Sequence, residues 1–263
     1  MLRAFNNHRT LGDNIRLGTL TAFSAGMINV ASLVILFSFT SNVTGTYAIL
    51  ASEIAKGNPY QIAVVLCWIL AFFGGGFLAN LIVIHWSKNH TYRAHAVPVV
   101  VEMLAVLAVG FYGGFFYRET LGETEVLTAI LLLATGLQNG LTASITNFSL
   151  KTTHVTGITT DLAILAAMFT KAEFRHNPEL RNKAKLLSSV VAAYFAGALA
   201  AGFLAVKLDF AVFYIVAGFL FFVATYDFYR VWRAQGGLRL SGWLKPQHAH
   251  TSLSQGDSVN AKL

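Results

Sequence analysis

Charged residues are scarce in this chain. Of its 263 residues, 12% are Asp, Glu, Lys or Arg and 55% are hydrophobic, whereas a soluble domain carries about 25% charged residues. This balance excludes a soluble enzyme, a disordered chain and a collagen-like or coiled-coil rod, and leaves an integral membrane protein. Cysteine is nearly absent as well: Cys67 is the only one, so an internal disulfide framework is also excluded.

The sequence contains several long apolar segments. A membrane-spanning helix needs about 20 mostly apolar residues, and six segments reach that length. Each is apolar all round, and none shows the alternation over about 10 residues that is typical of outer-membrane strands. The residues before the first run are polar and carry no signal-peptide cleavage pattern, so we expect the first span to be retained. The predicted spans are Leu17–Phe39, Gln61–Trp86, Ala94–Tyr117, Val126–Leu150, Leu186–Val206 and Phe210–Trp232.

Two further apolar segments are too short to cross a bilayer. Val43–Lys56 and Val155–Lys171 each follow a full span, and each begins with a Thr-Gly step. Thr and Asn favour helix N-caps and Gly interrupts a preceding helix, so each segment is predicted to be a short helix that restarts after a break. A helix of about 14 residues rises about 21 Å, less than the roughly 30 Å hydrocarbon core.

Three short matches in the same order indicate an internal duplication, a common construction in transporters and channels. The offset between matched residues grows from 110 to 126 because the second half carries an extra charged stretch, Lys171–Lys185. If each half crosses the membrane three times, the two halves enter from opposite sides and form inverted repeats. Chance similarity among apolar helices is the alternative. The matches pair Ala25–Asn29 with Thr135–Asn139, Ser41–Gly45 with Thr153–Gly157, and Gly76–Ala79 with Gly202–Ala205.

The distribution of Lys and Arg predicts the topology. Six crossings with both termini inside place 15 of the 19 basic residues on the cytoplasmic side, a strong positive-inside bias that accounts for the net charge of +7 without nucleic acid. Eight crossings, with both short helices spanning and the repeats parallel, give the same count. We favour six because the short helices are too short to span. Both termini are cytoplasmic in either arrangement.

The predicted fold is therefore all-α. It is a polytopic membrane helical bundle of six spans and two short broken or re-entrant helices, arranged as two inverted three-helix repeats. The regions are a cytoplasmic N-terminus (1–16), the first repeat (17–117), the second repeat (118–235) and a disordered cytoplasmic tail (236–263), whose composition is polar. Glycine clusters at 74–76, 110–114 and 197–202 are predicted to be faces of close helix packing.

The two helix breaks are the strongest candidate site. Backbone groups exposed by a break at membrane depth are tolerated only inside protein or facing water. The N-terminus of a short helix offers free N–H groups and about half a positive charge, so two such ends near the midplane would bind an anion or a polar solute. Ordinary turn and cap chemistry at the membrane surface is the alternative. The predicted lining residues are Asn42, Thr44, Gly45, His154, Thr156 and Gly157.

Polar amides within the spans are candidates for the same site. Asn29, Gln138 and Asn139 are costly in hydrocarbon unless they are paired. They either join the repeats by interhelical hydrogen bonds or line a polar path, and Asn29 and Asn139 are predicted to contribute to binding. His154 is the only clearly intramembrane histidine in this interpretation. It serves either as a gate or proton relay, or simply as a hydrogen-bond donor to a carbonyl.

Two carboxylates are candidate coupling residues. Asp161 lies one helical turn after Gly157; it either binds a coupling proton, pairs with His154 or Lys151, or caps its helix. Glu102 lies in the third predicted span, a few residues after Pro98. An ionisable residue there is a functional candidate by default, although it is close enough to the end of the span to snorkel to the surface.

No pattern predicts an enzyme. Hydrolase, zinc-protease and nucleotide-binding motifs are not found in the sequence. His85, His90 and His95 have a five-residue spacing that does not place them on one helix face, and no carboxylate or cysteine completes a metal set. We therefore predict no catalytic residues, no metal, no cofactor and no nucleic-acid partner.

At these residues the chain resembles the YoaK-like family of bacterial membrane proteins of unknown function, over about residues 10 to 235. The second motif matches closely; in the first, Asn29 replaces the family's acid and Thr46 replaces an asparagine. The resemblance implies a six-span bacterial inner-membrane protein, and the change at Asn29 puts in doubt any coupling that this acid performs. The motifs stand as Gly26-x-x-Asn29, Phe39–Thr46, Gly136–Asn139 and Thr153–Gly157, with Thr160-Asp161 beyond.

These features together predict a transporter or channel for a small polar or anionic solute, working in the lipid bilayer through a central site at the paired breaks. The first alternative is a non-transporting scaffold or accessory subunit, because no residue clearly specifies a substrate. The second is an intramembrane enzyme, which would require a nucleophile within hydrogen-bond reach of His154. A homo-oligomer is left open.

Overall fold

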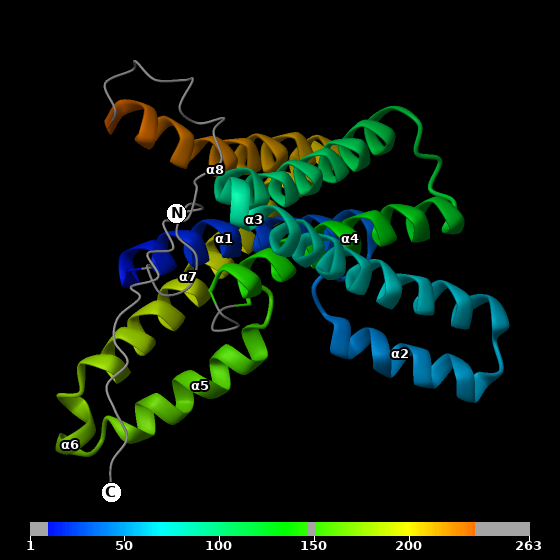
Figure 1. The fold of residues 1–263 in the computed structure, drawn as a ribbon. Coiled ribbons are helices and arrows are strands. Elements are labelled where there is room, and N and C mark those ends of the chain that lie inside the picture. Colours follow the sequence, from blue (N-terminus) through cyan, green and yellow to red (C-terminus); the bar gives the residue numbers. More distant parts are fainter. Residues whose placement is uncertain (1–9, 147–150, 235–263) are drawn as a thin grey trace, which may run out of the picture.

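The described residues form a bundle of helices (Figure 1), in a computed structural model that covers residues 10–146 and 151–234 and the side chains of these apart from 88–91 and 227–234. No strand occurs among them. The disorder predicted for 236–263 and most of the predicted N-terminal region lie outside the described residues. The elements are α1 (Leu11–Leu36), α2 (Val43–Lys56), α3 (Pro59–Phe115), α4 (Leu121–Ile145), α5 (Val155–Met168), α6 (Ala172–Arg175), α7 (Pro178–Leu208), η2 (Asp209–Ala211) and α8 (Val212–Ala234).

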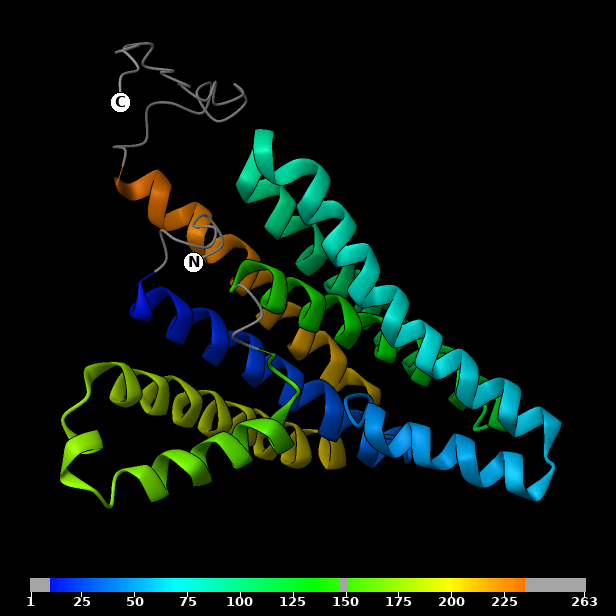
Figure 2. The ribbon, with the colours of Figure 1, turned by 60° about the horizontal axis from the view of Figure 1, so that its bottom comes forward.

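Helix α3 contains two of the predicted spans. Its backbone is helical from Pro59 to Phe115, but the ribbon reverses direction part-way, so that its two arms run back alongside each other (Figure 2). The arms Pro59–Ser87 and Tyr92–Phe115 are each long and apolar enough to cross a membrane. The turn therefore lies where the sequence places charged and polar residues between two apolar runs.

Five stretches of the described chain are long and apolar enough to span a bilayer. The last of them, Pro178–Tyr226, runs through α7, η2 and α8 as far as Tyr226. Large apolar side chains also cover the outer surface; Phe73, Phe203 and Val206 are among the most exposed. An outer surface this apolar is typical of lipid contact, so the helices indicate a multi-pass integral membrane protein.

The charged stretch Lys171–Lys185 is mostly helical. It contains α6, and then α7 begins at Pro178 with Asn177 as its N-cap, whose Oδ1 accepts from the backbone N–H of Glu179 at 2.9 Å. Asn followed by Pro is a strong helix-start signal, so this connector becomes the first turns of a long helix. Helix α5, in turn, ends at Met168 rather than Lys171.

Two helix pairs carry the closest packing: α1 lies against α7, and the first arm of α3 lies against α4. In each pair the backbones approach across two glycines. A Cβ added at Gly26 would lie 2.1 Å from the Tyr194 carbonyl oxygen, and one at Gly197 would lie 2.0 Å from that of Phe23. Only glycine allows such an approach.

The α3–α4 pair repeats this arrangement. A Cβ at Gly136 would lie 2.2 Å from the Phe72 carbonyl oxygen, and one at Gly75 would lie 2.1 Å from that of Leu133. Gly26 and Phe23 lie 110 positions before Gly136 and Leu133, the offset of the sequence repeat, and Gly75 and Phe72 lie 122 positions before Gly197 and Tyr194. The first helix of each half therefore packs on a later helix of the other half. The predicted packing is confirmed at Gly75 and Gly197, whereas Gly114 has open space beside it.

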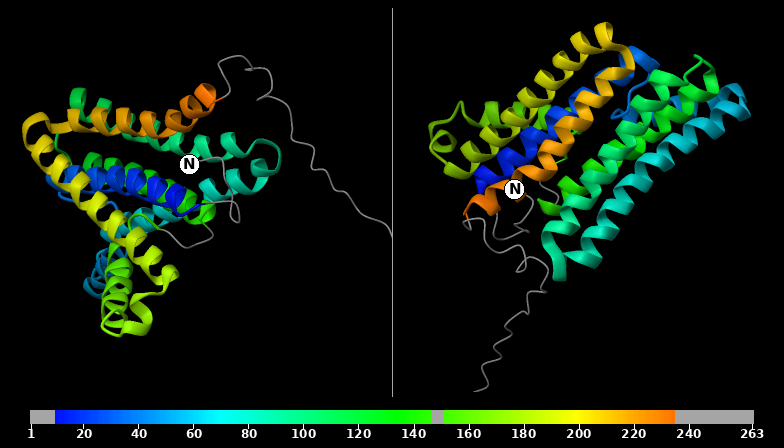
Figure 3. Two further views of the ribbon diagram at one scale, coloured as in Figure 1. Left: turned by 90° about the vertical axis from the view of Figure 1, so that its left-hand side faces the viewer. Right: turned by 90° about the horizontal axis from the view of Figure 1, so that it is seen from above.

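The two short helices extend in opposite directions. Helices α2 and α5 begin near the middle of the molecule and run away from each other toward its two ends (Figures 1 and 2). Both project from the same side of the bundle (Figure 3, left). Helix α2 begins at Val43 and α5 at Val155, the starts that the sequence predicts.

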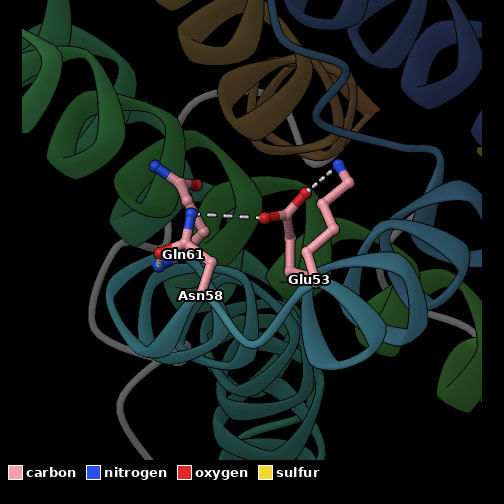
Figure 4. A network of polar contacts seen from close by, with 4 residues as sticks. Glu53, Asn58 and Gln61 are labelled. Atoms are coloured by element: carbon pink, nitrogen blue, oxygen red, sulfur yellow. Dashed lines mark hydrogen bonds and ion pairs between the residues drawn. The ribbon is translucent and has the colours of Figure 1, made fainter.

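A tight turn returns the chain from α2 to α3. Gly57 has φ 67° and ends α2, and Asn58 then caps α3, its Oδ1 accepting from the backbone N–H of Gln61 at 3.3 Å. Glu53 receives a hydrogen bond from Asn58 Nδ2 at 3.4 Å and an ion pair from Lys56 at 2.6 Å (Figure 4). Left-handed backbone favours glycine, which explains Gly57 at the turn. The hydrogen bond between Glu53 and Asn58 joins the end of α2 to the start of α3.

Candidate functional site at the two helix breaks

The first break is held by Asn29, a buried residue of α1. Its Oδ1 accepts hydrogen bonds from the backbone N–H groups of Thr40 at 3.0 Å and Ser41 at 3.1 Å, in the segment between α1 and α2. Its Nδ2 donates to the Tyr194 hydroxyl of α7 at 2.9 Å. Because non-helical backbone in a membrane protein needs internal partners, Asn29 supplies the acceptor that this break requires.

The second break is held in the same way by Asn139 of α4. Its Oδ1 accepts from the backbone N–H of Thr153 at 3.2 Å and from the Thr152 hydroxyl at 3.3 Å, and its Nδ2 donates to Thr153 Oγ1. Asn29 and Asn139 are the matched asparagines of the repeat, and Ser41 and Thr153 are matched as well. The matched asparagines therefore make one corresponding hydrogen bond, from the backbone N–H of Ser41 and of Thr153.

Each short helix starts with a side chain that folds back over a glycine. Asn42 caps α2, with its Oδ1 accepting from Gly45 N–H at 3.1 Å. The His154 ring occupies the matching place at α5 but makes no cap hydrogen bond. A Cβ at Gly45 would lie 2.6 Å from Asn42 Nδ2, and one at Gly157 would lie 2.3 Å from the His154 ring. The Thr-Gly steps therefore make room for the residue that precedes each helix.

Both breaks contact the same turn of α4. The Thr135 hydroxyl donates to the Thr40 carbonyl of the first break at 2.6 Å. Gln138 Oε1 accepts from the Thr152 hydroxyl of the second break at 3.4 Å. Three residues of an α-helix rise about 4.5 Å, so the two breaks meet α4 within one turn of each other, in the middle part of Leu121–Ile145. Ala25 stands at the position of α1 that matches Thr135 and has no hydroxyl group to donate.

A buried polar cluster adjoins this turn. Gln138 Nε2 donates to Ser24 Oγ of α1 at 2.7 Å and to Glu102 Oε1 of α3 at 2.9 Å. Glu102 is completely buried, so it does not snorkel, and its Oε2 has no hydrogen-bond partner. The cluster joins three helices and, through Thr152, the second break. Gln138 and Asn29 thus link the two halves, whereas Asn139 bonds within its own half.

The polar residues at the starts of the short helices lie on the surface. Asn42, Thr44, His154 and Thr156 are exposed, while Gly45 and Gly157 are half-buried beneath the cap side chains. The cap chemistry considered as the alternative is therefore present at Asn42. Both breaks lie beside the middle of α4, next to the polar residues Asn29 and Asn139.

Asp161 belongs to a separate contact. Its Oδ2 pairs with Lys183 Nζ of α7 at 3.1 Å, and both side chains are about half exposed. The ion pair joins α5 to α7, so the partner of Asp161 is Lys183 rather than His154 or Lys151, the pairing that was one of the alternatives for this residue.

Among the described side chains, the buried histidine is His95, not His154. His95 has no exposed surface on the second arm of α3, whereas His154 is exposed. Sequence pattern does not single out His95, because apolar periodicity does not show which face of a span turns inward. Thr40, Thr135 and Thr152 are missed as well, since threonines are common in apolar helices, and only their position beside the repeat motifs distinguishes them.

Comparison with known proteins places the chain in a family. A family described as a protein of unknown function, DUF1275, matches residues 17–226. The chain belongs to the DUF1275 family. This match confirms the resemblance carried by the repeat motifs, and it includes both breaks, α4 and Glu102. No curated protein and no solved structure matches the chain.

Proposed function

We propose that this protein moves a small polar or anionic solute across a membrane, as a channel or secondary transporter, by a route that passes between the two helix breaks. The observation that carries the proposal is the contact of both breaks with one turn of α4, through Thr135 and Gln138. Paired broken helices at the interface of two repeats are a recurrent construction of substrate sites in transporters.

The proposal includes a topology of six crossings with inverted repeats. Helices α1 and α4 run in opposite directions in Figure 2. The matched glycines Gly26 and Gly136 each join the first helix of one half to a helix of the other half. The 49-residue stretch Pro178–Tyr226 is long enough for two crossings. The positive-inside bias favours cytoplasmic termini, and the family resemblance favours a bacterial inner membrane.

The solute class follows from the groups at the breaks. The first N–H groups of α2 and α5 have no intrahelical partner and favour a negatively charged or hydrogen-bond-accepting solute. Exposed hydroxyl and amide groups lie beside them at Asn42, Thr44 and Thr156. These side chains offer hydrogen bonds to a small polar molecule, and the surrounding apolar helices favour solutes that need little hydration.

Flux through reconstituted protein tests the proposal. Proteoliposomes are exposed in a stopped-flow light-scattering assay to osmotic steps of glycerol, urea, sodium nitrate and sodium formate. At least one solute should equilibrate faster than in protein-free liposomes. Asn42→Ala and His154→Ala should slow that solute, because both residues border the breaks.

Asn58→Ala provides a matched control. Asn58 is also an N-cap, accepting from Gln61 N–H, but it lies in the α2–α3 turn and away from the breaks. Its loss should leave flux unchanged while costing stability of about 1 kcal/mol, as cap losses do. Unchanged flux in both break variants, together with flux in the wild type, would overturn the proposed route.

A scaffold or accessory subunit is the second candidate. The exposed faces of α2 and α5, which project from one side of the bundle, favour it because they offer a surface to another membrane protein. Absence of flux for every solute tested would favour this role over transport.

A further inference from the structure

We infer that Glu102 is a proton-binding site that couples proton uptake to solute binding at the second break. The inference deepens the proposed function and rests on it for the coupling, although proton binding itself is tested separately. The juxtaposition that carries it is a fully buried carboxyl group linked to the break through one amide, Gln138.

The environment of Glu102 leaves one carboxyl oxygen available. Oε1 accepts from Gln138 Nε2 at 2.9 Å, and Oε2 is buried with no hydrogen-bond partner. The ion pairs found among the described residues are Lys56–Glu53 and Lys183–Asp161, and neither of them includes Glu102. A carboxylate buried without a cation is costly, so the group requires a positive charge from elsewhere.

A proton fits this position better than a metal ion. Sodium, magnesium and calcium are held by several oxygens, whereas here Gln138 presents its amino group to both Glu102 and Ser24. No group of three or more His, Cys, Asp or Glu side chains comes together among the described residues. A single unpartnered carboxyl oxygen is sufficient to bind a proton.

The helices around Glu102 offer few other titratable groups. On the same face of α3, two turns before Glu102, lies the buried His95, and a proton passing along this face would meet it next. Tyr92 donates its hydroxyl to the Ala224 carbonyl of α8 at 2.7 Å. The remaining titratable or charged side chains that the structure describes on α1, α3, α4 and α8 are Asp13 and Arg16 of α1, Tyr60, Cys67, His85, Arg93 and Tyr112 of α3, Glu123 and Glu125 of α4, and Tyr214 and Tyr226 of α8.

The link to the break gives the proton its role. From Glu102 to the second break there are two hydrogen bonds, of 2.9 Å to Gln138 Nε2 and 3.4 Å from Thr152 to Gln138 Oε1. A negative charge on Glu102 repels an anion at the adjacent N-terminus of α5, and protonation removes that repulsion. Binding of each therefore favours binding of the other, because coupling between two sites is reciprocal.

Infrared difference spectroscopy tests proton binding without a solute. Reconstituted protein is compared at about pH 5 and about pH 9, a range that spans carboxyl and imidazole titration. The wild type should show the C=O band of a protonated carboxyl group in a low-polarity environment. Glu102→Gln should lose this band, Glu102→Asp should keep it at a shifted frequency, and the control Asp161→Asn should leave it unchanged.

Nitrate uptake by proteoliposomes tests the coupling, because nitrate does not titrate in this range. Acidification should accelerate uptake by about tenfold in the wild type, a usual size for coupled sites, and should have no effect in Glu102→Gln. Loss of the band only in Glu102→Gln supports the proton site even if no nitrate flux is found, in which case the proposed function alone fails. A wild type without the band, a band that survives in Glu102→Gln, or equal pH dependence of flux in both proteins overturns the inference.

Discussion

At the scale of single residues, two asparagines decide the shape of the site. Each lies near the middle of a predicted span and satisfies the backbone of the break that follows it. An amide suits this task because its oxygen can accept two N–H groups while its nitrogen donates elsewhere. Asn29 and Asn139 therefore act first as supports of the breaks, and they contribute to binding through the backbone that they position.

Replacing either asparagine should destabilise the fold. Asn29→Ala leaves the N–H groups of Thr40 and Ser41 without their acceptor, and Asn139→Ala does the same at Thr153. Unsatisfied buried donors cost about 1–3 kcal/mol. Unfolding of the purified protein by sodium dodecyl sulfate in mixed micelles measures the loss.

Thr225→Ala is the control for this pair. The Thr225 hydroxyl is exposed and bonds only to carbonyl groups of its own helix, at Phe221 and Phe222, so its loss should change stability by less than about 0.5 kcal/mol. Asparagine variants as stable as this control would contradict the supporting role.

At the scale of elements, four glycines set how the helices pair. Helix α1 approaches α7 and α4 approaches the first arm of α3, each through two glycines whose neighbours are backbone atoms rather than movable side chains. Association of helices in lipid depends on such close backbone approach. Without it, the segments that carry the breaks would not be held in their present positions within the bundle.

Gly26→Ala and Gly136→Ala should each force a helix pair apart. The new Cβ would lie 2.1 Å and 2.2 Å from a carbonyl oxygen, so backbone must shift at a cost of about 1–3 kcal/mol or more. The same unfolding assay measures this cost, and similar losses in the two variants are expected because their environments are matched.

Gly218→Ala tests whether the loss comes from contact or from glycine itself. Gly218 lies within α8 with no neighbour near the position of a Cβ, so alanine there should be neutral or should stabilise by up to about 1 kcal/mol through helix propensity. If all three variants lost stability equally, close packing would not be the explanation.

At the scale of the whole molecule, the first helix of each half packs on a helix of the other half: α1 on α7, and α4 on the first arm of α3. The short helices of the two halves extend toward opposite ends of the molecule (Figure 2). The side of the membrane on which each loop lies therefore distinguishes six crossings from eight. With six crossings, Lys56 at the end of α2 faces outward and Arg93 near the turn of α3 faces the cytoplasm. With eight crossings the two exchange sides.

Cysteine labelling distinguishes these arrangements. In a Cys67→Ser background, Lys56→Cys should react with a membrane-impermeant maleimide in intact cells, and Arg93→Cys should react only after the cells are opened. The reverse pattern would support eight crossings. In the otherwise unchanged protein, Cys67 should stay unlabelled until denaturation although it is exposed in the structure, because lipid covers the span that contains it.

The sequence by itself determined the helices and their breaks. Runs of about 20 apolar residues define spans in any bilayer, and the cap and glycine signals at Asn42 and Gly157 locate the short helices, because these effects act within one helical turn. The repeat motifs also identified Asn29 and Asn139. Tertiary structure alone decided the partners: it joined Asp161 to Lys183, buried His95, and brought Glu102 to Gln138. Periodicity identifies apolar helices but not their neighbours, and a span that is apolar all round does not indicate which face turns inward.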